Sequence, residues 1–90
     1  MEIKVLGPGC ANCKRLYAEV EKAVAQTGQP ATISKVERME DIVAAGILRT
    51  PGLVIDGQIV SSGRIPGAAE IATMITTALA RDVRQRLGGS

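Results

Sequence analysis

Histidine, phenylalanine and tryptophan are absent from this chain of 90 residues, and Tyr17 is its one aromatic residue. A hydrophobic core therefore has to be built from Ile, Val, Leu, Ala and Met. Without histidine, a tetrahedral zinc site made from protein ligands alone would need two chains. The formal net charge is only +2, and no basic stripe is interleaved with stacking residues, so the composition argues against a nucleic-acid partner.

Long apolar segments are also missing. No stretch approaches the length needed to span a bilayer, and the apolar run after Met1 is too short for the core of a signal peptide. Two cysteines do not make a disulfide-stapled secreted scaffold, so the expected location is a reducing cytoplasm. We predict one soluble domain over residues 1–87, with no membrane partner, and a flexible tail over residues 88–90.

The two cysteines stand close together, in Cys10-Ala11-Asn12-Cys13. They follow a short apolar run and a Gly-Pro-Gly turn, and a helical pattern begins directly behind them. A thiol at the start of a helix meets unpaired backbone N–H groups and the positive end of the helix dipole, and both favour the thiolate. This pair is the main candidate for a functional site.

Periodicity and turn residues predict the order β-α-β-α-β-β-α. The segment 31–36 does not alternate cleanly, which indicates an edge strand or a twisted one. Asp56-Gly57 lies between two apolar runs and predicts a hairpin with a type I′ turn. The fold class is α/β, with a mixed four-stranded sheet between helices and a parallel first β-α-β unit. The expected strands span residues 2–6, 31–36, 52–55 and 58–61, and the expected helices span residues 11–26, 40–45 and about 66–84.

This order, with Cys-x-x-Cys at the first strand-to-helix junction, resembles the thioredoxin fold. Lys14 directly follows the second cysteine, as it does in thioredoxins. The stretch 46–57 looks like the thioredoxin segment in which a helix ends, a cis-proline follows and a strand leads into a hairpin. Gly63-Arg64-Ile65-Pro66 then opens the last helix. The resemblance covers essentially the whole chain and is closest to the small thioredoxin-like proteins of archaea and bacteria called redox-active disulfide proteins.

The sequence departs from the thioredoxin pattern in three respects. Gly9 stands where an aromatic residue usually precedes the first cysteine, and Ala11-Asn12 replaces the Gly-Pro between the cysteines. Thioredoxins often hold a buried carboxylate six residues before the first cysteine. Lys4 occupies that position here, with Glu2 as a nearby carboxylate on the same strand. The group that receives the proton of the second cysteine is therefore open.

The resemblance implies a thiol–disulfide oxidoreductase that needs no bound cofactor or metal. Disulfide exchange requires a thiolate attacker, an accessible sulfur and a second thiol close enough to resolve the mixed disulfide. We predict that Cys10, in the loop or at the helix cap, is the attacker and that Cys13, one turn into the helix, resolves. Lys14 either adds positive potential that favours the thiolate or belongs to a solvated, charged first turn of the helix. The expected partners are disulfide-bearing protein substrates and an upstream thioredoxin reductase or glutathione-type donor.

Thr50-Pro51 is the second candidate site. Cis bonds are rare among X-Pro pairs, but in thioredoxin-like proteins this proline is cis and packs beside the Cys-x-x-Cys. The resemblance implies the same here, which would leave the backbone N–H and C=O of Thr50 free to pair with an extended substrate. The predicted substrate-binding residues are Thr50, Pro51 and Gly9.

Two other functions stay open at this stage. Cu(I) or Zn(II) carriers with a ferredoxin-like fold also place Cys-x-x-Cys at the first strand–helix junction. Such carriers usually have Met two residues before the first cysteine, where this chain has Pro8, and they end in a strand. A thiol-based redox sensor would use the same cysteines without turning over a general substrate.

Overall fold

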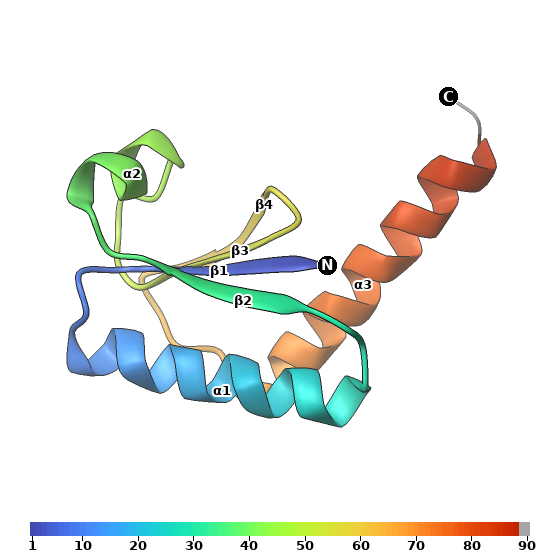
Figure 1. The fold of residues 1–90 in the computed structure, drawn as a ribbon, viewed down its shortest axis with the longest axis horizontal. Coiled ribbons are helices and arrows are strands. Elements are labelled where there is room, and N and C mark those ends of the chain that lie inside the picture. Colours follow the sequence, from blue (N-terminus) through green and yellow to red (C-terminus); the bar gives the residue numbers. More distant parts are fainter. Residues whose placement is uncertain (89–90) are drawn as a thin grey trace.

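The computed structural model describes residues 1–88 and confirms the predicted order of elements (Figure 1). The last helix begins two residues later than predicted and continues past residue 84. The predicted tail starts at Gly88, which is the final residue of that helix, and residues 89–90 lie outside the described part. The strands are β1 (Glu2–Leu6), β2 (Thr32–Val36), β3 (Gly52–Ile55) and β4 (Gln58–Ser62), and the helices are α1 (Ala11–Thr27), α2 (Met39–Ala44) and α3 (Ala68–Gly88).

The strands form one mixed sheet in the order β2-β1-β3-β4. β1 pairs in parallel with β2, across the α1 connection, and antiparallel with β3. β2 is therefore an edge strand, which agrees with its poor alternation of apolar residues. β1 lies inside the sheet, and so the loop that follows it emerges between the ends of two neighbouring strands.

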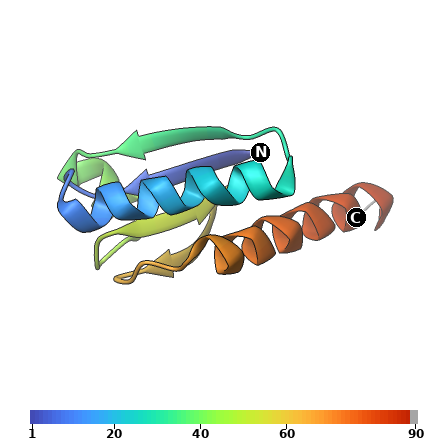
Figure 2. The ribbon, with the colours of Figure 1, turned by 90° about the horizontal axis from the view of Figure 1, so that it is seen from below.

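Helices cover both faces of the sheet. α1 and α3 pack on one face, where Figure 2 shows them side by side, and α2 lies on the other face (Figure 1). Alternation along β1 sends Ile3 and Val5 toward α1 and α3, and it sends Leu6 toward α2. The core between the sheet and α1 and α3 contains Ile3, Val5, Leu16, Val20, Ala23, Leu53, Ile55, Ile71, Ile75 and Ala78.

At two turns, the residue types explain the positive φ values of the backbone. Gly28 ends α1 in the left-handed conformation, at φ 68°, and its N–H caps the carbonyl of Val24. Asp56 and Gly57 join β3 to β4 with φ values of 47° and 81°. Both central residues of this hairpin thus have the positive φ that a type I′ turn requires.

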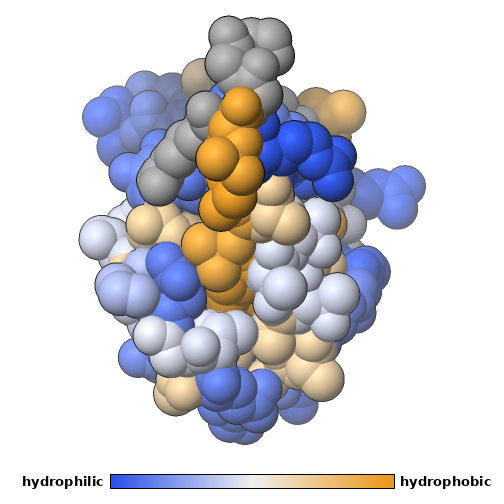
Figure 3. Space-filling model, turned by 90° about the vertical axis from the view of Figure 1, so that its right-hand side faces the viewer, coloured by the Kyte–Doolittle hydropathy of each residue, from blue (hydrophilic) through white to orange (hydrophobic). Residues whose placement is uncertain are grey.

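α3 reaches beyond the sheet. Figure 3 looks onto this side of the molecule and shows a strip of apolar residues along it. Val83 and Leu87 are exposed there and line an open depression together with Leu79. Within residues 1–88, no helix combines the length and the apolar character needed to cross a membrane.

Two leucines provide a matched test of the core. Leu16 is fully buried under the sheet, whereas Leu48 is 90% exposed. We expect Leu16→Ala to lower the free energy of unfolding by about 2–5 kcal/mol, because it removes buried methyl groups and leaves a cavity. Leu48→Ala should change it by less than about 0.5 kcal/mol. Urea unfolding measures both, and equal effects would contradict the core assignment.

Candidate active site

Cys10 is the N-cap residue of α1. Its backbone is extended, with φ −69° and ψ 169°, and its sulfur accepts the backbone N–H of Cys13 at 3.3 Å. The first turn of a helix has N–H groups without intrahelical partners, so a sulfur in this position satisfies one of them. The sequence prediction of a cysteine at the cap is confirmed by this geometry.

The two sulfur atoms lie 2.6 Å apart, and both cysteines are free. Cys10 is exposed, whereas Cys13 is only 6% exposed and faces the interior. One thiol is therefore available to a partner in solution, and the second lies directly beside it.

The two thiols differ in acidity. The pKa of Cys10 is lowered, first by a hydrogen bond from the Cys13 thiol and then by backbone N–H groups at the helix start. The pKa of Cys13 is raised, first by burial and then because its thiol proton is held by Cys10. At any pH, a larger fraction of Cys10 than of Cys13 is therefore present as thiolate, which suits Cys10 to attack and Cys13 to resolution.

Gly7 lets Cys13 and Pro51 come together. A Cβ atom at position 7 would overlap the sulfur of Cys13 and would lie 3.8 Å from the Cα atom of Pro51. The Thr50–Pro51 peptide bond is cis, Pro51 is buried and Thr50 is exposed. The predicted proximity of Pro51 to the cysteine pair and the predicted cis bond are both present.

Gly9 makes room for a carboxylate that the sequence did not reveal. Its φ is +89°, and a Cβ atom at this position would lie 2.9 Å from Oε2 of Glu37. Glu37 follows β2 directly, and the N–H of Gly7 donates to the carbonyl of Val36 at 2.9 Å. The end of β2 is thereby tied to the loop in front of Cys10.

A small cavity of about 70 Å³ lies behind this loop. It is lined by Val5, Gly7, Gly9, Cys13, Lys14, Lys35 and Glu37. The cavity brings the buried cysteine together with three charged side chains: Lys14 of α1, Lys35 of β2 and Glu37 directly after β2. Cys13, Gly9 and Lys14 were predicted from the sequence, whereas Gly7, Lys35 and Glu37 were not. Only the pairing of β1 with β2 brings Lys35 and Glu37 here.

The carboxylate expected on β1 is not at this cavity. Lys4 forms an ion pair with Glu2 at 3.6 Å, and neither residue lines the space beside Cys13. Glu2 is the first residue of β1, while the cysteine loop follows the other end of the strand. Glu2, the nearby carboxylate that the sequence offered, is therefore not the group beside Cys13.

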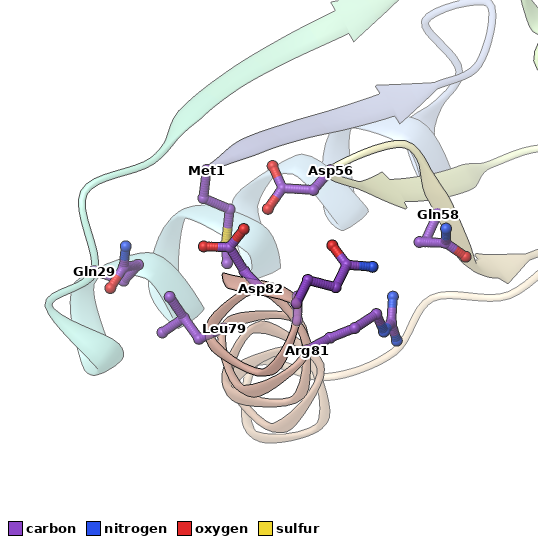
Figure 4. Close-up of a pocket in the computed structure, with 9 residues that line it drawn as sticks. Met1, Gln29, Asp56, Gln58, Leu79, Arg81 and Asp82 are labelled. Carbon is purple, nitrogen blue, oxygen red and sulfur yellow. The ribbon is translucent and has the colours of Figure 1, made fainter. Parts of the chain in front are cut away.

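A second cavity lies at the opposite end of the sheet from the cysteines, between the start of β1, the β3–β4 turn and α3 (Figure 4). Its volume is about 430 Å³, and polar side chains such as Asp56, Gln58 and Arg81 surround it. It shares no residue with the cavity at Cys13. Across residues 1–88, no three His, Cys, Asp or Glu side chains gather as a group suited to a metal ion.

The chain is similar in sequence to a known family of proteins and to two relatives. A family model described as a thioredoxin domain matches residues 1–76, which include both cysteines and Thr50-Pro51. A thioredoxin of Methanothermobacter thermautotrophicus is 36% identical over 76 residues, covering 84% of this chain and 99% of that protein. A thioredoxin of Methanocaldococcus jannaschii is 41% identical over 69 residues, covering 77% of this chain and 79% of that protein.

The acidity of Cys10 is testable by alkylation. The rate of its reaction with iodoacetamide should rise with pH around a midpoint below that of an ordinary cysteine, because Cys13 donates to its sulfur. Cys13→Ala removes the thiol donor and should move the midpoint upward. Cys13→Ser keeps a hydroxyl donor, so its midpoint should lie between those of the wild type and of Cys13→Ala. An unchanged midpoint in Cys13→Ala would contradict the assigned cause.

The close approach at Gly7 gives a second test. We expect Gly7→Ala to lower the free energy of unfolding by about 1–3 kcal/mol, because the new methyl group must displace Cys13. Gly67→Ala is the matched control, since a Cβ atom there meets no other atom within 4 Å. Urea unfolding of the reduced proteins compares the two, and equal stabilities would show that Gly7 tolerates a side chain.

Proposed function

Because the chain belongs to the thioredoxin family and is a thiol–disulfide oxidoreductase, we propose that it reduces disulfides of protein substrates through Cys10 and Cys13. The observation that carries these roles is the contrast between an exposed capping sulfur with a lowered pKa and a buried neighbouring thiol with a raised one. The location proposed for this activity is the cytoplasm.

The proposed cycle has two exchange steps. The Cys10 thiolate attacks one sulfur of a substrate disulfide, forms a mixed disulfide and releases the other substrate sulfur as a thiolate. Cys13 then attacks the Cys10 sulfur, closes the Cys10–Cys13 disulfide and releases the second substrate thiol. An upstream donor of the thioredoxin reductase or glutathione type returns two electrons to the pair.

Substrate binding is proposed at the loop around Thr50. Among residues 1–88, the loop and turn hydrogen bonds do not involve the Thr50 backbone, whereas the Pro51 carbonyl accepts from Gly63 at 3.0 Å. Thr50 is exposed, and its neighbour Pro51 approaches Gly7 and Cys13. An extended peptide placed here would pair with the Thr50 N–H and C=O, with Gly9 leaving its path open on the other side of the sulfurs.

Lys14 is proposed to favour the Cys10 thiolate through its positive charge. It lies in the first turn of α1, and its side chain lines the small cavity beside Cys13. The side chain is exposed, so its effect is screened by solvent and is smaller than that of the hydrogen bonds on the Cys10 sulfur.

Cysteine variants test the division of roles. We expect Cys10→Ser to abolish reduction of insulin disulfides, because it removes the attacking sulfur. Cys13→Ser should instead accumulate a mixed disulfide with the substrate, visible by mass spectrometry and released by dithiothreitol, because nothing resolves it. If both variants kept full activity, or if wild-type protein bound Cu(I) or Zn(II) stoichiometrically and reduced no disulfide, a carrier would replace this proposal.

A further inference from the structure

The resolving step sets a chemical requirement. Cys13 is buried and its pKa is raised, so its thiol has to lose a proton before the sulfur can attack Cys10. The usual strand position offers Lys4, whose ammonium group has hydrogen-bond donors but no acceptor and is paired with Glu2. A proton acceptor must therefore reach Cys13 from another element.

We propose that Glu37 accepts the proton of Cys13 through the small cavity that both side chains line. The proposal rests on the role of Cys13 as the resolving cysteine. The cavity, of about 70 Å³, has room for at least one water molecule, and the polar groups of Lys14, Lys35 and Glu37 in its lining supply partners for it. A carboxylate is an effective general base when it is held within reach of the proton, directly or through one water.

The backbone before Glu37 is tied to the cysteine loop, and its carboxylate lies beside Gly9. The Gly7 N–H···O=C Val36 bond fixes the end of β2 against the cysteine loop. Gly9 has no side chain, and the Glu37 carboxylate approaches the space that a Cβ atom would need. Glu37 is also exposed, so a proton that it accepts passes on to bulk solvent.

The other charged groups at the cavity are cations. Lys14 comes from α1 and Lys35 from β2. The Lys35 ammonium lies 4.8 Å from the centroid of the Tyr17 ring, which keeps it on the α1 side of its strand. Glu37 is the carboxylate that lines this cavity.

The step balances as a proton transfer coupled to disulfide exchange. The Cys13 S–H bond breaks and its proton passes through the cavity to a carboxylate oxygen of Glu37. The Cys13 sulfur then forms a bond to Cys10, and the bond from Cys10 to the substrate sulfur breaks. The substrate sulfur leaves with the electron pair.

The aromatic disulfide DTNB separates the two steps in the reduced protein. Attack by Cys10 releases a first thionitrobenzoate anion, and resolution by Cys13 releases a second one. We expect Glu37→Gln to leave the first phase unchanged and to slow the second about ten- to a hundredfold near pH 7, because an amide accepts no proton. Glu37→Asp should retain part of the rate.

The matched control is Glu40→Gln. Glu40 makes its ion pair with Arg38 at 2.7 Å and does not line the cavity, so both phases should match wild type. The deficit of Glu37→Gln should shrink as pH rises, because hydroxide then removes the Cys13 proton directly. A merely structural role for Glu37 would give a deficit that is the same at every pH.

Three results would overturn the proposal. The second phase of Glu37→Gln could match or exceed wild type, its deficit could be independent of pH, or Glu40→Gln could be slowed equally. If wild-type protein released no second thionitrobenzoate, the resolving role of Cys13 would fail and the Glu37 proposal with it. By contrast, if the wild-type protein shows a normal second phase and Glu37→Gln shows the same one, only the role of Glu37 is contradicted.

Discussion

The sulfur of Cys10 caps α1, and the rest of the site depends on this contact. It accepts the Cys13 N–H at 3.3 Å and lies 2.6 Å from the Cys13 sulfur. Because a cap must stand at the helix start, the first sulfur stays at the surface, and because Cys13 lies one turn further on, the second faces the core. One local interaction thus produces both the acidic, exposed thiol and the protected one.

Two glycines, Gly7 and Gly52, stand where a side chain would collide with neighbouring residues. Gly7 leaves space for the Cys13 sulfur, and a Cβ atom at Gly52 would lie within 2.9 Å of three side-chain atoms of Ile47. The antiparallel pairing of Leu6 with Gly52 sets the two segments side by side. The sheet register therefore positions the site, while the absence of side chains at these glycines allows its parts to touch.

Most of the fold follows from local sequence signals. The capping cysteine, Gly28 and the Asp56-Gly57 turn each mark an element boundary by their own conformational preferences. The surroundings of Cys13 were harder to predict, because Glu37 and Lys35 reach it only through the parallel pairing of β1 with β2, more than twenty positions along the chain. The length of α3 was underestimated because its last turns are apolar on one side without being buried, so burial does not mark where the helix ends.

The glycine at position 9 and the carboxylate at position 37 occupy adjoining space. A side chain at position 9 would need both the positive φ of Gly9 and the space beside the Glu37 carboxylate. The residue usually found before the first cysteine of thioredoxins is aromatic and would fill that space. In a chain with an aromatic side chain there, a carboxylate at the end of β2 would have no access to the cavity beside Cys13. The glycine loop and the proposed proton route therefore depend on each other, and Lys4 is free to occupy the strand position where thioredoxins often hold a buried carboxylate.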